Sequence, residues 1–74
     1  MDYDFLLTFI ETEAEVELEH ARNSIELADM YQDKGDLEKA EDYTIMARVA
    51  TVKARALRDE YARVVKELKG EMGD

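Results

Sequence analysis

The residues of this chain that come closest to a chemical site are Glu17 and His20, which stand in a Glu-x-x-His pattern. Glu13 lies one helical turn before them. On a helix this spacing places a carboxylate and an imidazole on one face, and four-helix bundles that bind two metal ions through carboxylates use such pairs. The pattern therefore makes Glu13, Glu17 and His20 candidate ligands of a ferritin-like metal site, which a second copy of the chain would have to complete at a dimer interface.

A second interpretation of the same residues is structural. The stretch expected to face them, residues 49–53, supplies no carboxylate, and Lys53 places a cation beside the candidate site. Glu17 and Lys53 would come level across two antiparallel helices and form a salt bridge worth about 0 to 1 kcal/mol if exposed. His20 would then pack in an apolar interface. We favour this interpretation, because Glu-x-x-His without partner carboxylates is a weak signal, and we expect no metal or cofactor.

Other kinds of catalytic chemistry have no pattern in this sequence. The chain contains no cysteine, which excludes thiolate metal sites and disulfides. No phosphate-binding loop is present, and no combination of Ser, His and Asp has a plausible triad geometry on two long helices. The sequence therefore predicts a protein that is not an enzyme.

The elements that would position these residues meet at one short stretch, Asp33 to Asp36, the only place before Gly70 where a helix can end and another begin. Gly35 can take the left-handed conformation that closes a helix, and Asp36 can cap the next one. We therefore predict a helix over residues 3–34, a turn at 33–36, a helix over 37–69 and a frayed tail at 70–74. A connection this short makes the two helices antiparallel neighbours.

Apolar residues recur every three or four positions in both predicted helices, which places them on one face of each. In the first helix they are Tyr3, Leu7, Ile10, Ala14, Leu18, Ala21, Ile25 and Ala28. In the second they are Tyr43, Met46, Ala47, Ala50, Ala54, Leu57, Tyr61, Val64 and Leu68. Folding the chain at Gly35 brings the two patterns level, and several of the resulting pairs set a small residue against a large one. We predict a single all-α domain over residues 1–74, an antiparallel two-helix hairpin packed like a coiled coil.

A second apolar stripe is left over once the seam is formed. It consists of Phe5, Phe9, Val16, Leu27, Met30, Ile45, Val49, Val52 and Ala56. We expect this stripe to lie on one side of the hairpin and to meet a second copy, because a soluble monomer seldom exposes so long an apolar surface. The expected product is a homodimeric four-helix bundle. Its predicted interface is Phe9, Val16, His20, Leu27, Ile45, Val49, Val52 and Ala56.

Charge is distributed unevenly along the chain, whose formal net charge is −9. The first helix carries an acidic face of Glu11, Glu15, Glu19, Glu26 and Asp29. The second carries a basic face of Arg48, Arg55, Arg58, Lys66 and Lys69. Because an acidic field repels phosphate groups, we expect no nucleic-acid partner and no membrane partner. The acidic first helix is the surface that a protein partner would meet.

The acidic start of the sequence, the lack of an apolar run of about 18 residues and the lack of cysteine indicate a cytoplasmic protein. The window from Ala21 to Ala47 resembles a tetratricopeptide-type helical hairpin, with small residues at Ala28 and Ala40 and with Gly35-Asp36 in the turn. No second repeat follows, and such repeats need about three copies to be stable, so the family is not assigned. The expected function is a small, acidic, oligomerising interaction or scaffold module, with metal binding as the alternative.

Overall fold

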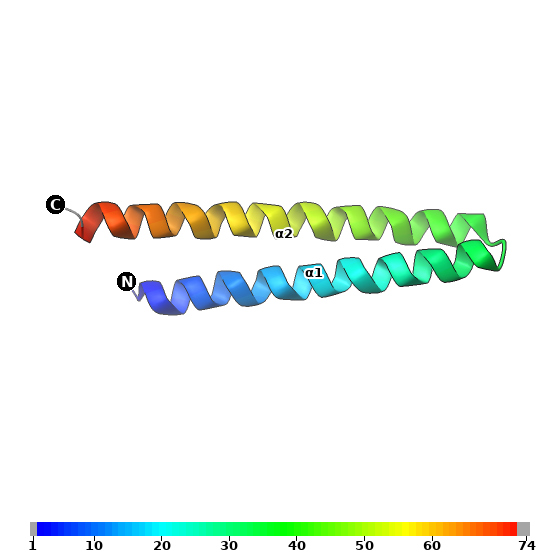
Figure 1. The fold of residues 1–74 in the computed structure, drawn as a ribbon, viewed down its shortest axis with the longest axis horizontal. Coiled ribbons are helices and arrows are strands. Elements are labelled where there is room, and N and C mark those ends of the chain that lie inside the picture. Colours follow the sequence, from blue (N-terminus) through cyan, green and yellow to red (C-terminus); the bar gives the residue numbers. More distant parts are fainter. Residues whose placement is uncertain (1, 73–74) are drawn as a thin grey trace.

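The chain folds into two long helices joined by a tight turn. The computed structural model describes residues 2–72, with the side chains of residues 2–70. Helix α1 spans Tyr3–Asp33 and helix α2 spans Leu37–Met72. Figure 1 shows α1 and α2 side by side, with the turn at one end of the rod and the end of α2 extending past the start of α1 at the other. The predicted all-α antiparallel hairpin is therefore confirmed.

Helix α1 begins at a cap that the sequence analysis did not identify. The Asp2 carboxylate accepts a hydrogen bond from the backbone N–H of Phe5 at 3.1 Å. This bond satisfies one of the four amide groups that have no partner inside the first turn of a helix. Asp4 adds a second negative charge in that turn, where the helix dipole is positive.

The turn adopts the conformation and the helix cap that its residue types predicted. Gly35 has φ +82°, in the left-handed region, and its N–H donates to the Gln32 carbonyl at 3.0 Å. The Asp36 N–H donates to the Tyr31 carbonyl at 2.9 Å, and these two bonds together form a Schellman motif. The Asp36 carboxylate then accepts from the Lys39 N–H at 3.2 Å, so it caps α2 as predicted.

The core of the hairpin is a thin seam of small residues. Eight of the described side chains are buried: Ile10, Ala14, Ala21, Ala28, Ala40, Ala47, Ala50 and Ala54. Seven of the eight are alanines, so the helices approach closely and bury little apolar volume. In Figure 1 the two ribbons lie nearer each other toward the turn than at the open end, where Leu57 and Tyr61 replace alanines in the seam.

The seam prediction fails at two positions and omits a third. Ile25 and Met46, both predicted to lie in the seam, are 51% and 54% exposed. The neighbouring residues Ala28 and Ala47 are buried instead, and the close helix contact that alanines allow leaves no room for two larger side chains. Ala40 is buried near the turn although it was not placed in the predicted seam.

Helix α2 is longer than predicted. It continues through Gly70 to Met72, whereas the sequence placed a frayed tail from residue 70 onward. Glycine costs about 1 kcal/mol in a helix interior compared with alanine, and one such residue does not end a helix when no capping geometry accompanies it. Residues 73 and 74 of the predicted tail lie outside the described part of the chain.

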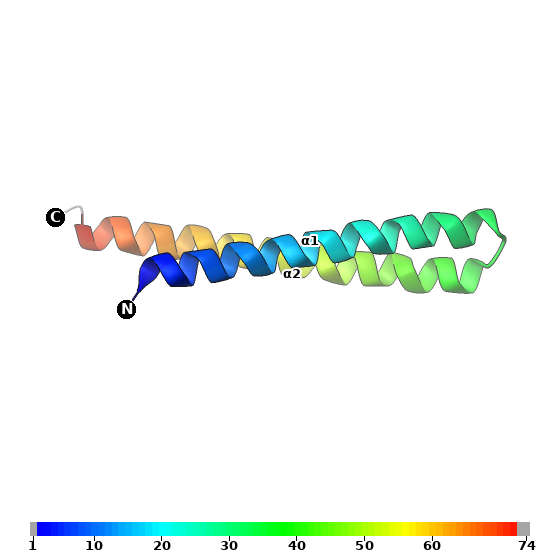
Figure 2. The same cartoon turned by 90° about the horizontal axis from the view of Figure 1, so that it is seen from below.

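The molecule is a rod of 60 × 15 × 13 Å. Its radius of gyration is 17.0 Å, whereas a compact domain of this length would have about 11 Å. Seen from below in Figure 2, α1 passes across α2 near the middle of the rod, as in a pair of helices that wrap around each other. Neither helix, over the described residues, has the length and apolar content needed to cross a membrane.

Candidate functional site

The three candidate metal ligands lie on α1, on one side of the seam. Glu17 and His20 line a groove between the helices together with Asn23 and Ser24 of α1. The opposite wall belongs to α2 and consists of Ile45, Met46, Val49, Ala50 and Lys53. Glu13 is exposed and does not line this groove. We refer to this depression as the His20 groove.

The His20 groove holds few of the ligands that a metal ion needs. Within the described residues, no three His, Asp or Glu side chains form a group that could hold a metal ion. The predicted ligand set is therefore not assembled by a single hairpin. Lys53 on the facing wall adds a positive charge, which works against a cation in the same groove.

Glu17 and Lys53 face each other across the groove, as their sequence positions predicted. No ion pair joins these two side chains in the described part of the chain. Glu17 is half-buried and Lys53 is exposed, so water competes for both charges. The predicted salt bridge is therefore absent from a single hairpin, although the two charges remain neighbours.

Ser24 completes a pattern that the sequence analysis overlooked. Glu17, His20 and Ser24 follow one another at i, i+3 and i+7 and line the same groove, so a carboxylate, an imidazole and a hydroxyl share one face. No hydrogen bond links these side chains in the described residues. Backbone N–H groups in the middle of a helix are used by the helix itself, so an oxyanion hole from the main chain is lacking. The spacing alone therefore does not build a nucleophilic site.

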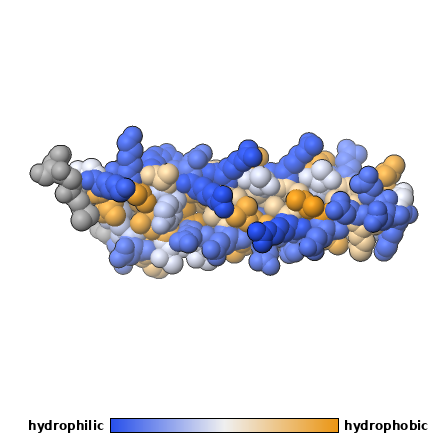
Figure 3. Space-filling view, viewed as in Figure 1, coloured by the Kyte–Doolittle hydropathy of each residue, from blue (hydrophilic) through white to orange (hydrophobic). Residues whose placement is uncertain are grey.

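The larger feature of the surface is its exposed apolar residues. Ten large hydrophobic side chains among the described residues are between 39% and 71% exposed: Phe5, Phe9, Val16, Ile25, Met30, Leu37, Ile45, Met46, Val49 and Val52. Figure 3 shows apolar patches between charged side chains along the length of one face. Leu27 is half-buried and Ala56 is exposed.

Helix geometry assigns most of the second stripe to the side of the His20 groove. On α1, Phe9, Val16 and Leu27 fall on the same flank of the seam as His20, because separations of 11, 4 and 7 residues all return to one face of a helix. On α2, Ile45 and Val49 line the groove directly, and Ala56 follows Val49 by seven residues. These residues with His20 are called the His20 face below.

Val52 lies at the edge of the second stripe. It lines the groove on the other side of the seam, together with Ile25, Ala28, Asp29, Thr44, Ala47, Arg48, Thr51 and Arg55. Val52 follows Ile45 of the His20 face by seven residues, yet it also borders this second groove. Three residues advance a helix by less than a full turn, which turns Val52 away from Val49 and toward this groove.

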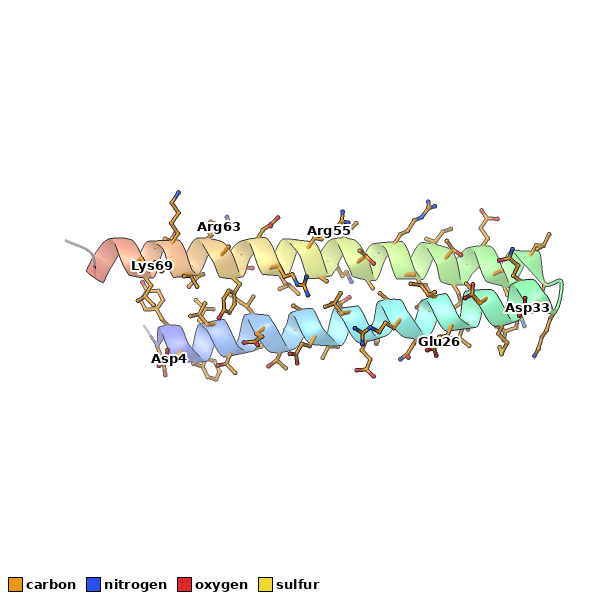
Figure 4. All side chains as sticks on the ribbon, viewed as in Figure 1. Asp4, Glu26, Asp33, Arg55, Arg63 and Lys69 are labelled. Atoms are coloured by element: carbon orange, nitrogen blue, oxygen red, sulfur yellow. The ribbon has the colours of Figure 1, made fainter. Side chains whose placement is uncertain are left out.

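The side of the rod that includes Val52 carries opposite charges on its two walls. One groove there is lined by Glu11 and Glu15 of α1 and by Arg58 of α2. The next has Asp29 of α1 opposite Arg48 and Arg55 of α2. In Figure 4 the labelled acids Asp4, Glu26 and Asp33 all come from α1, and the labelled bases Arg55, Arg63 and Lys69 all come from α2. The labelled acids thus lie on α1 and the labelled bases on α2.

The hydroxyl groups of two threonines on α2 donate hydrogen bonds to carbonyls of their own helix. The Thr44 hydroxyl donates to the Ala40 carbonyl and the Thr51 hydroxyl to the Ala47 carbonyl, each at 2.8 Å. Such bonds to the preceding turn remove hydroxyl groups from contact with other partners. Among the described residues, no buried side-chain nitrogen or oxygen lacks a hydrogen bond.

Comparison of the chain with protein-family models, with curated proteins and with solved structures finds no match.

Proposed function

We propose that this protein is a non-enzymatic interaction module that works as a homodimer, in which two hairpins pack through their His20 faces to form a four-helix bundle. The observation that carries the proposal is the distribution of side-chain size. Seven of the eight buried residues are alanines, whereas ten large hydrophobic residues are exposed. A monomer would place the large residues inside, because burying one of them contributes about 1.5 to 3 kcal/mol and burying a single methyl group only about 0.8 kcal/mol.

The surface area supports the same proposal. The single hairpin exposes 5941 Å², whereas a compact monomer of this mass exposes about 4,700 Å². The excess of about 1,200 Å² exceeds the roughly 800 Å² that each partner buries in a stable protein interface. A second copy laid along the His20 face has the length and apolar content to remove that excess.

The chemistry of the grooves supports a role in binding rather than catalysis. All three grooves run along the outside of the rod and combine apolar side chains with charged rims. That composition is typical of a surface that accepts another helix. The acidic α1 is the surface that we propose for a protein partner of the dimer, because its outer charges Glu19 and Glu26 remain exposed when the His20 face is covered.

Sedimentation equilibrium at micromolar concentration tests the proposal. The expected result is a particle of twice the chain mass of 8.6 kDa, with a melting temperature that rises with protein concentration. A folded hairpin that sediments as a monomer and melts at a concentration-independent temperature would contradict the proposal.

A further inference from the structure

Two hairpins that meet face to face can obey twofold symmetry in only two ways. A twofold axis along the rod keeps both turns at the same end and places α1 of one copy over α2 of the other. A twofold axis across the rod puts the turns at opposite ends and places α1 over α1 and α2 over α2. The choice between the two depends on what each helix presents to its counterpart.

The charges of the two helices differ strongly. Helix α1 holds nine acidic residues against Arg22 alone, which gives −8, and α2 holds seven acids against eight bases, which gives +1. Stacking α1 on a second α1 would therefore bring together two helices that each carry −8. Stacking α1 on α2 brings together −8 and +1. Packed helices lie about 10 Å apart, comparable to the screening length of about 8 Å at physiological salt, so salt weakens this charge difference without abolishing it.

The contrast is sharpest in the middle of the rod. Residues 43–58 of α2 contain four bases and no acid, namely Arg48, Lys53, Arg55 and Arg58. The segment of α1 that lies level with them, residues 13–28, contains five glutamates and one arginine. The two segments thus carry opposite charges of equal size. Arg48, Arg55 and Arg58 line grooves on the other side of the seam and contribute only through the net charge of α2. Glu17 and Lys53 lie on the His20 side, where only the arrangement with α1 over α2 brings each charge to its opposite.

The His20 groove places two of these charges at the proposed interface. Glu17 and Lys53 stand on opposite walls near the middle of the rod and do not pair within one chain. With the axis along the rod, Glu17 lies opposite Lys53 of the partner subunit, and four charges alternate in sign around the centre. With the axis across the rod, each charge would lie opposite its own copy.

From these charges we infer that the two hairpins dock in parallel, with both turns at one end and each α1 lying on the partner's α2. This inference rests on the proposed homodimer and adds its orientation. It also defines the occupant of the His20 face as a second copy of this chain, whose α2 carries Lys53 opposite Glu17 of the α1 beneath it. A parallel bundle has two chemically different ends, one with both turns and one with all four chain ends.

Pulsed electron paramagnetic resonance on single-cysteine variants tests the orientation, and the chain contains no native cysteine to interfere. One nitroxide label is placed at the turn through Asp33→Cys. The control label is placed through Glu19→Cys, near the middle of α1. Both positions are exposed. Because Glu19 lies near the middle of the rod, the control labels of the two copies are at the same height along the rod in either orientation. The distance between them therefore reports dimer formation alone.

A parallel dimer predicts that the two turn labels lie well within half of the 60 Å length of the molecule. An antiparallel dimer predicts a turn-to-turn distance that approaches that full length. A short control distance together with a long turn distance would overturn the inference and leave the proposed homodimer standing. The absence of any control distance would contradict the homodimer itself.

Discussion

The ring of Tyr31 in α1 stacks on the ring of Tyr43 in α2, with centroids 5.6 Å apart and planes inclined by 2°. The ammonium groups of Lys34 and Lys39 lie 5.8 and 5.2 Å from the centre of the Tyr31 ring. The aromatic stack and the Lys39 contact therefore join α1 to α2 immediately beside the turn, whereas Lys34 closes α1 itself. They add a contact to a seam that otherwise consists largely of alanine.

Replacing Tyr43 with alanine should lower the free energy of unfolding by about 2 kcal/mol, because it removes the ring stack and the burial of a half-buried ring. Chemical denaturation at fixed protein concentration measures this change. Tyr43→Phe is the matched control and should cost little, since the stack depends on the ring rather than on the hydroxyl. Equal losses for both substitutions would show that the hydroxyl matters more than the stack.

The glycines at positions 35 and 70 should respond to alanine with opposite signs. Gly35 has φ +82°, so Gly35→Ala should lower the free energy of unfolding by about 1 to 2 kcal/mol. Gly70 lies inside α2, and a Cβ there would meet nothing within 4 Å. Gly70→Ala should therefore raise the free energy of unfolding by about 0.5 to 1 kcal/mol. A stabilising Gly35→Ala would be incompatible with the left-handed turn.

Val49 and Val52 form a matched pair for locating the interface, because both are exposed valines of α2 that line opposite grooves. Val49→Glu should raise the dimer dissociation constant by about a hundredfold or more, since it buries an unpaired charge in the proposed contact. Val52→Glu should leave the dimer intact. Analytical ultracentrifugation over a dilution series measures both. If only Val52→Glu dissociates the dimer, the interface lies on the opposite side of the rod.

The alanine seam should be intolerant of larger residues. Ala54 is the most buried side chain, at 1% exposure, and Ala54→Leu should lower the free energy of unfolding by about 1 to 3 kcal/mol because the helices must separate to admit it. Ala62 is exposed on the same helix, so Ala62→Leu serves as the control and should change stability by less than about 0.5 kcal/mol. Thermal and chemical denaturation compare the two variants.

His20 distinguishes the proposed interface from the metal-site alternative. If the ring packs in the dimer, His20→Leu should lower the dissociation constant by up to about tenfold, because it replaces a polar ring with apolar volume. Metal analysis of the purified native protein after dialysis should find no stoichiometric iron, manganese or zinc. Stoichiometric metal that disappears in His20→Ala would favour the metal-binding alternative instead.

Residue types near the turn determined its conformation before any tertiary structure was considered. Gly35 takes the left-handed conformation and Asp36 caps α2, because both effects operate over three or four residues and depend on side chains that lie next to each other in the chain. The antiparallel arrangement of α1 and α2 followed from the shortness of that connection. The N-terminal cap at Asp2 was predictable by the same rule and was overlooked.

What the sequence by itself determined was therefore the two helices, their turn and six of the seven buried alanines of the seam, since a helical period of 3.6 residues places these on one face without knowledge of the partner helix. Only the tertiary structure decided how wide that seam is. Because the helices approach closely at Ala28 and Ala47, Ile25 and Met46 lie outside the seam and line opposite grooves. The rotation of α2 about its axis places Val49 in one groove and Val52 in the other. These outcomes depend on the spacing and rotation of one helix against the other, which periodicity along a single helix does not specify.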